Sequence, residues 1–251
     1  MTVYFVGAGP GAADLLTIRA QRLIAAAPVV LYAGSLVPAE VLAGARPGAR
    51  LIDTAELDLD AITAELVAAH RAGQDVVRLH SGDPSIFSAV AEQARRLDAA
   101  GVPWQVVPGV PAFAAAAAAL GQELTLPGVG QTVVLTRTAA RATPMPPGED
   151  LATLGATGCT LVLHLAVQNI DQVTADLLPH YGADCPAAVV ARASWPEEEV
   201  LRCDLGELAD RVRERGIRRT AIIVVGRVLR ESSFRDSHLY SADRERGREG
   251  N

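Results

Sequence analysis

Short apolar runs alternate with amphipathic stretches along the first 120 residues. The strand-like runs cover 3–6, 29–32, 75–79 and 104–107, and the helix-like stretches cover 14–26, 58–72, 86–100 and 112–120. In the stretch 58–72, Leu59, Ile62, Leu66 and Ala69 recur at the three- and four-residue spacing of an amphipathic helix. Uninterrupted apolar strands are typical of a parallel sheet covered on both faces. The pattern predicts an α/β domain with a mainly parallel sheet and flanking helices.

The second half of the chain repeats this alternation after a break rich in glycine and proline. Its predicted strands are 132–136, 160–165, 187–192, 199–202 and 220–225, and its predicted helices are 168–178 and 205–215. We therefore expect an N-terminal α/β domain (1–120), a linker (121–131), a C-terminal α/β domain (132–230) and a flexible tail (231–251). Residues 137–150, rich in proline, threonine and arginine, predict a long loop of the functional or mobile kind.

Composition narrows the class of protein. The chain has 251 residues, 49% of them hydrophobic, which excludes disorder over most of its length. Its net charge of −6 disfavours a nucleic-acid partner. The chain has 23 arginines and no lysine, which excludes Schiff-base chemistry on a lysine and a P-loop lysine. Any anionic substrate would be bound by guanidinium groups, whose geometry suits carboxylates.

Cysteine and histidine spacing argues against a metal site. Cys159, Cys185 and Cys203 lie far apart without a C-x-x-C pair, and the five histidines are scattered. Unpaired cysteines favour a reducing compartment, so we expect the cytoplasm. No apolar run reaches the roughly 18 residues that a membrane span requires, so no membrane partner is expected.

The most distinctive short segment is GAGPGA at residues 7–12, directly after the first strand. Formally it fits the G-x-G-x-x-A pattern of dinucleotide folds. Those folds need an acidic residue at the end of the second strand, where this chain has Ala33, Gly34 and Ser35. Pro10 also removes an N–H group that a phosphate would require. A tight strand-to-helix turn remains, at the edge of the sheet where α/β folds bind ligands.

Two further strand ends carry similar turns. HSGDPSIF (80–87) and VVPGVPAF (106–113) again combine glycine with proline at the carboxyl end of a strand. Because the carboxyl ends of parallel strands meet at one sheet edge, we expect the three turns to form one ligand site.

These segments resemble the tetrapyrrole methylase family, enzymes that use S-adenosyl-L-methionine (SAM) to methylate corrin and sirohaem precursors. The resemblance extends through LVLHLAV (161–167), AAVVARASWPEE (187–198) and TAIIVVGRVL (220–229) and so covers nearly the whole chain. Within the family, LYAGSLVP (31–38) and LTRTAARATPMP (135–146) look like the branch that methylates a precorrin in cobalamin biosynthesis. Ala33 stands where uroporphyrinogen methylases typically have aspartate, which counts against that substrate.

The resemblance implies a two-domain α/β fold with a mainly parallel N-terminal sheet and a mixed sheet in the C-terminal domain. Such a protein is usually a homodimer that binds SAM between its domains and releases S-adenosyl-L-homocysteine. Carried over position by position, the implied cofactor contacts are Pro10, Gly82, Asp83, Ile86, Pro111, Ala112, Leu165, Ala193 and Ala221. Pro111 replaces a threonine or serine found in many relatives, and Ala193 replaces a glycine found in some. For Asp83, the alternative to ligand binding is a cap on the helix after Pro84.

The sequence also offers candidates for residues that bind the substrate. Tyr32, Ser35, Arg137 and Arg141 are the candidates for contact with the acidic tetrapyrrole, the arginines through its carboxylates. No catalytic side chain is assigned, because an electron-rich ring carbon can attack an activated methyl group itself. The alternatives are another precorrin position, uroporphyrinogen III, an RNA ribose or a modified histidine as acceptor, a non-catalytic nucleotide-binding regulator and, disfavoured, an NAD-dependent oxidoreductase.

Overall fold

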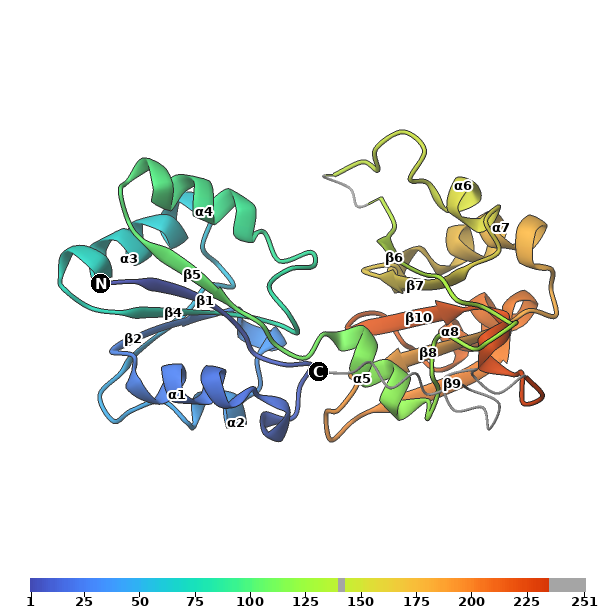
Figure 1. Ribbon diagram of the computed structural model, residues 1–251, viewed down its shortest axis with the longest axis horizontal. Coiled ribbons are helices and arrows are strands. Elements are labelled where there is room, and N and C mark those ends of the chain that lie inside the picture. The colour runs from blue at the N-terminus through green and yellow to red at the C-terminus, as the bar shows by residue number, and fades with distance from the viewer. Residues whose placement is uncertain (140–142, 235–251) are drawn as a thin grey trace, which may run out of the picture. The chain divides into compact units, whose positions relative to one another are not determined.

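The chain folds into two compact units. The structure, a computed structural model, describes residues 1–139 and 143–234. The first unit comprises Met1–Ala119 together with Arg192–Glu199. The second comprises Leu120–Ala191 and the residues from Val200 onwards. Each unit is built on one five-stranded sheet (Figure 1).

The sheet of the first unit is entirely parallel, as predicted. Its strand order is β3-β2-β4-β1-β5, and all four neighbouring pairs run in the same direction. The strands are β1 (Val3–Gly7), β2 (Val29–Tyr32), β3 (Arg50–Asp53), β4 (Val76–His80) and β5 (Trp104–Val107). All five carboxyl ends therefore lie at one edge, with β1 between β4 and β5.

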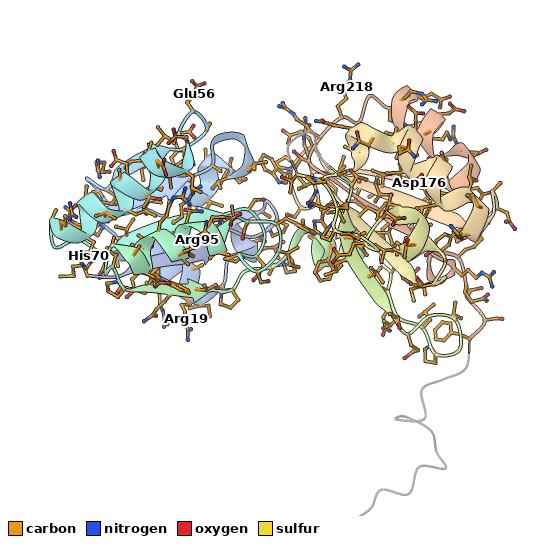
Figure 2. All side chains as sticks on the ribbon, turned by 90° about the horizontal axis from the view of Figure 1, so that it is seen from above. Arg19, Glu56, His70, Arg95, Asp176 and Arg218 are labelled. Carbon is orange, nitrogen blue, oxygen red and sulfur yellow. The ribbon has the colours of Figure 1, made fainter. Side chains whose placement is uncertain are left out.

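Helices cover both faces of this sheet (Figure 1). α1 (Ile18–Ala26) and α2 (Ala39–Leu42) cover one face, and α3 (Leu59–Arg71) and α4 (Val90–Ala99) cover the other. A fifth helix of this unit, α5 (Ala112–Ala119), follows β5. Successive strand side chains point to opposite faces, so Phe5 packs with α3 and α4 whereas Val6 packs with α1 and α2. This double burial explains the uninterrupted apolar runs. Polar side chains such as Arg19 on α1 and Arg95 on α4 are exposed (Figure 2).

The second unit contains the predicted mixed sheet, with strand order β6-β7-β10-β8-β9. Its strands are β6 (Val133–Arg137), β7 (Thr160–His164), β8 (Pro186–Ala191), β9 (Glu199–Asp204) and β10 (Ala221–Val225), and its helices are α6 (Leu151–Gly155), α7 (Ile170–Tyr181) and α8 (Leu208–Glu214). β6 and β7 are parallel, while β10 is antiparallel to both β7 and β8. Buried residues of α7 and α8 share one core with the sheet, among them Val173, Leu177 and Leu208.

Several elements differ from the sequence predictions. α1 begins at Ile18 rather than residue 14, because the Thr17 hydroxyl accepts the N–H of Ala20 at 3.1 Å and caps the helix there. α4 begins at Val90 rather than residue 86, and the predicted helix 205–215 starts with a 3-10 turn before α8. The sequence pattern did not predict α2, β3 or α6. The two helices are only 4 and 5 residues long, and β3 is largely exposed.

Two polar side chains of β4 are buried among the apolar residues. Arg78 donates a 3.0 Å hydrogen bond to the hydroxyl of Thr54, which in turn donates to the carbonyl of Tyr32 at 2.9 Å. The ring of His80 lies 5.7 Å from that of Phe5, and His80 is only 5% exposed. Burial, reinforced by the nearby Arg78 guanidinium, lowers the pKa of His80 to about 3, so the imidazole is neutral at pH 7.

The buried imidazole makes the stability of the first unit depend on pH. An unfolded histidine takes up a proton below a pKa of about 6.5, whereas folded His80 stays neutral until about 3. Between these values the unfolded state binds more protons, so acidification lowers the free energy of unfolding by about 1.4 kcal/mol per pH unit. We expect His80→Gln to remove this contribution to the change of unfolding free energy with pH between pH 6.5 and 4. Denaturant titrations at several pH values measure it. Both tryptophans, Trp104 and Trp195, belong to the first unit and report its unfolding. An identical slope in the variant would contradict the assignment.

Candidate ligand site

The loops after β1, β4 and β5 meet at the carboxyl edge of the first sheet. β1 pairs with both of the other strands, so the three loops start side by side. Gly9 and Gly82 exchange two backbone hydrogen bonds, of 3.2 Å from the Gly9 N–H and 2.7 Å from the Gly82 N–H. The convergence of the three glycine- and proline-bearing turns, expected from their strand positions, is thus confirmed.

Three glycines allow these loops to touch through their backbones. A Cβ atom on Gly7 would lie 2.6 Å from the Cα of Gly109 and 2.7 Å from the carbonyl oxygen of Gly82. On Gly109 it would lie 2.3 Å from that same oxygen. Gly82 also has a φ of +68°, which side chains rarely adopt. The loop cluster therefore has no room for a side chain at its centre.

The first loop has most of its backbone polar groups already engaged. The N–H of Ala8 donates to the backbone carbonyl of His80 at 2.8 Å, and the N–H of Gly9 donates to the carbonyl of Gly82. Pro10 has no N–H group. The N–H of Ala12 donates to the hydroxyl of Ser194 at 3.0 Å. A phosphate cradle needs several free N–H groups pointing at the ligand. This geometry supports the exclusion of a pyrophosphate-binding loop.

The surroundings of the end of β2 differ from the sequence prediction. The end of β2 has no acidic residue, but the neighbouring β3 ends with Asp53, a strand that sequence analysis missed. The Asp53 carboxylate accepts the N–H groups of Gly34 and Ala55, both at 2.9 Å. A carboxylate therefore does lie beside the end of β2, where it stabilises the local turns.

Asp83 joins the second loop to the third. One carboxylate oxygen accepts the N–H of Gly109 at 2.8 Å, and the other accepts the N–H of Ser85 at 2.8 Å together with the Ser85 hydroxyl. It caps no helix, because α4 begins only at Val90. Partial burial would raise the pKa of Asp83, but the hydrogen bonds from Ser85 and Gly109 outweigh burial and lower it. The loop cluster therefore holds an ionised carboxylate at neutral pH.

Backbone strain marks the same regions. Among the described residues, the non-glycine residues with positive φ are Phe87, Ala89, Leu165, Arg192, Ser194 and Thr220. Five of these six coincide with or directly adjoin residues that the family resemblance assigns to the cofactor, namely Ile86, Leu165, Ala193 and Ala221. Such conformations cost free energy and concentrate at functional sites. A non-glycine residue in this conformation leaves no mark in the sequence, so sequence analysis could not find the pattern.

The predicted cofactor residues are divided between the two units. Pro10, Gly82, Asp83, Ile86, Pro111, Ala112 and Ala193 belong to the first unit, and Leu165 and Ala221 to the second. In the first unit, a Cβ on Gly82 would lie 3.3 Å from the backbone nitrogen of Ala112. In the second, Leu165 follows β7 and is 68% exposed, while Ala221 begins the antiparallel neighbour β10. These two residues share one sheet edge. Their contact with a cofactor stays a prediction.

The predicted substrate residues have varied surroundings. Tyr32 ends β2, and its carbonyl accepts the N–H and hydroxyl of Thr54, both at 2.9 Å. Ser35 lies in the 3-10 turn Gly34–Leu36. The guanidinium of Arg137 donates to backbone carbonyls of its own loop, among them that of Thr138 at 3.0 Å. Binding of a carboxylate by Arg137 stays a prediction.

Arg141 lies outside the described residues, as does most of the expected tail 231–251. Among the residues described, no cluster of three or more histidine, cysteine or acidic side chains is placed to hold a metal ion. Burial raises the pKa of Cys203 to about 11, so this thiol is not a ready thiolate. Within the same residues, no helix is both long and apolar enough to cross a membrane.

Four residues that shape the site were not predicted from the sequence. Ser194 and Trp195 contact the first loop from the segment 192–199, 182 and 185 residues further along the chain. Arg78 and Thr54 connect β4 to the end of β2. The tryptophan in ASWPEE was the one sequence feature that could have indicated this contact. The Trp195 ring occupies the side-chain space of Gly11, and a glycine in the sequence does not reveal which residue fills that space.

The chain is similar to known proteins over most of its length. The family model described as Tetrapyrrole (Corrin/Porphyrin) Methylases matches residues 2–209. A precorrin-4 C(11)-methyltransferase from Rhodococcus erythropolis is 65% identical over 246 residues, which cover 98% of this chain and 99% of the relative. The X-ray structure of a cobalt precorrin-4 methyltransferase, a cobalamin biosynthetic enzyme, is 39% identical and has a TM-score of 0.89, covering 92% of this chain and 96% of its own.

A third relative was solved with a ligand. It is a uroporphyrin-III C-methyltransferase from Thermus thermophilus complexed with S-adenosyl homocysteine, 34% identical with a TM-score of 0.78 over 92% of this chain and 94% of its own. The chain thus belongs to the tetrapyrrole methylase family, which confirms the resemblance and the predicted fold class. Within that family, relatives between 55% and 65% identical are named precorrin-4 C(11)-methyltransferase, the branch indicated by residues 31–38 and 135–146.

The glycine contacts generate a stability prediction. We expect Gly109→Ala to lower the free energy of unfolding of the first unit by about 2–4 kcal/mol, because the new methyl group overlaps backbone that cannot move aside. Denaturant titration followed by tryptophan fluorescence measures this change. Gly44→Ala is the matched control, since its Cβ would meet its nearest atom at 3.6 Å, and it should change stability by less than about 0.5 kcal/mol. Equal effects in the two variants would contradict the close packing of the loops.

Proposed function

We propose that this protein is a SAM-dependent methyltransferase that methylates C-11 of precorrin-4 or of cobalt-precorrin-4 in cobalamin biosynthesis. Full-length identity of 65% to a relative of that name supports the proposal. The observation that carries it is the loop cluster after β1, β4 and β5, which combines closely packed glycines, few free N–H groups and an ionised Asp83. This combination disfavours phosphate and favours a ligand with a positive charge.

The chemistry of SAM fits this cluster. SAM has a sulfonium and an amino-acid group but no phosphate, so Pro10 and the engaged N–H groups are no disadvantage. The Asp83 carboxylate accepts three hydrogen bonds within the protein and retains a lone pair, since a carboxylate offers about four acceptor positions. It can therefore accept a further hydrogen bond from the ligand's ammonium or ribose hydroxyl. The closely packed glycines of the three loops place Asp83 where the second loop meets the third.

When bound, SAM supplies a methyl group already activated by its positively charged sulfur. The main task of the protein is then to align donor and acceptor and to exclude water. In the first unit, the closely packed loop cluster orients the donor through Gly82, Asp83 and Pro10. We assign no general base, because an electron-rich pyrrolic carbon supplies the nucleophile itself. Tyr32 and Arg137 are our proposed contacts for the carboxylate-rich tetrapyrrole.

Calorimetry tests the cofactor. We expect S-adenosyl-L-homocysteine to bind and NADH not to bind. Asp83→Ala should weaken the binding of S-adenosyl-L-homocysteine by roughly 10- to 100-fold, since it removes a charged acceptor and releases Gly109. Asp53→Ala is the matched control, because Asp53 also accepts two backbone N–H groups at this sheet edge. Unchanged affinity in a folded Asp83→Ala protein would defeat the role of Asp83, and NADH binding would favour an oxidoreductase.

Mass spectrometry tests the acceptor. Incubation with SAM and precorrin-4 should raise the mass of the pigment by one CH2 unit, because a methyl group is gained and a proton is lost. Uroporphyrinogen III and other precorrins should show no such gain. Methylation of one of those compounds instead would replace the proposed substrate but retain the reaction class. Ala33, at the position where uroporphyrinogen methylases typically have aspartate, favours the precorrin.

We further propose a cytoplasmic homodimer. The unpaired thiols of Cys159, Cys185 and Cys203 are consistent with a reducing compartment. Sedimentation of the purified chain over a range of concentrations tests the dimer.

A further inference from the structure

Trp195 contacts the loop that contains Pro10. The chain leaves β8 at Ala191 and reaches β9 at Glu199, and the residues between them belong by their contacts to the first unit. The indole N–H of Trp195 donates a 2.8 Å hydrogen bond to the carbonyl of Pro10. The ring fills the side-chain space of Gly11, where a Cβ would lie 2.1 Å from Cδ1 of the indole.

The segment that carries Trp195 is itself held in a defined shape. The Ser194 hydroxyl accepts the N–H of Ala12 at 3.0 Å, and the Ser194 N–H donates to the Glu198 carboxylate at 2.6 Å. The Trp195 N–H donates to the carbonyl of Arg192 at 2.9 Å. Arg192 and Ser194 have φ values of 49° and 68°, a strained conformation that persists only where surrounding contacts enforce it.

Together these contacts fix the Pro10–Gly11 peptide from two sides. Gly9 is paired with Gly82 on one side, while Trp195 and Ser194 hold Pro10 and Ala12 on the other. Without the indole, the carbonyl of Pro10 loses its protein partner and the space beside Gly11 opens. The peptide could then rotate, which would change the surface that the loop presents to a ligand.

We propose that Trp195 is a positioning residue for the SAM donor, acting through the Pro10–Gly11 peptide. This inference rests on the proposed use of SAM. It assigns to Trp195 no contact with the donor and no part in the chemistry. Its removal should therefore weaken donor binding and leave the methyl-transfer step intact once the donor is saturating.

The test compares two tryptophan variants of the full chain. Trp195→Phe retains an aromatic ring but loses the hydrogen bond to Pro10. Trp104→Phe is the matched control. Trp104 lies at the amino end of β5, and its indole N–H donates an equal 2.8 Å hydrogen bond to the carboxylate of Asp98 on α4. We expect Trp195→Phe to weaken S-adenosyl-L-homocysteine binding roughly 5- to 15-fold by calorimetry, as for one lost hydrogen bond, and Trp104→Phe to leave it unchanged.

Kinetics and fluorescence separate positioning from general stability. Trp195→Phe should raise KM for SAM by a similar factor without changing kcat. Because the chain has 2 tryptophans, S-adenosyl-L-homocysteine should change the emission of the wild type and of Trp104→Phe, but not that of Trp195→Phe. Loss of stability with unchanged affinity and KM would overturn the inference.

A double-mutant cycle tests whether the effect passes through Gly11. Gly11→Ala should weaken binding in the wild type, because its methyl group displaces the indole, but should cost little further in a Trp195→Ala background. Additive effects would overturn the proposed route. If the wild type itself fails to bind S-adenosyl-L-homocysteine, the proposed function fails. If the wild type binds and the Trp195 variants bind equally well, only the present inference fails.

Discussion

The central constraint in this protein is the contact between three backbones at the carboxyl edge of its parallel sheet. Gly7, Gly82 and Gly109 approach so closely that a methyl group on Gly7 or Gly109 would overlap its neighbours. This approach requires β1 to pair with β4 and β5 in register, which in turn depends on helices covering both faces of the sheet. Packing in the core thus sets the geometry of the loops.

The same contact determines which ligand chemistry the loops can serve. A glycine-rich turn that binds pyrophosphate keeps its N–H groups free for the ligand, whereas this one uses them to join neighbouring loops. What the cluster offers a ligand is the negative charge of Asp83. The sequence motif shared with dinucleotide folds therefore describes a turn shape, and its hydrogen-bond partners decide the ligand.

Sequence analysis predicted the elements with strong periodicity and the meeting of three loops. The mainly parallel first sheet followed from doubly buried strands, and the meeting of the three turns followed from strand ends sharing an edge. It failed where the signal was too short or too distant. β3 is largely exposed, so no apolar run marks it. Trp195 lies 185 residues from Pro10, and no local pattern connects a tryptophan with the glycine whose space it fills. Asp83 resembled a helix cap only because the start of α4 was placed too early.

The position of Trp195 in the chain bears on how the protein is made. The ribosome synthesises a chain from its N-terminus, so residues 1–119 leave the exit tunnel before the segment Arg192–Glu199, whose Trp195 contacts Pro10. A nascent first unit can pair its strands, but its first loop stays without the Trp195 and Ser194 contacts until most of the chain has left the exit tunnel. The loop is therefore completed only late in synthesis, which ties its final shape to the presence of β8 and the turn that follows it.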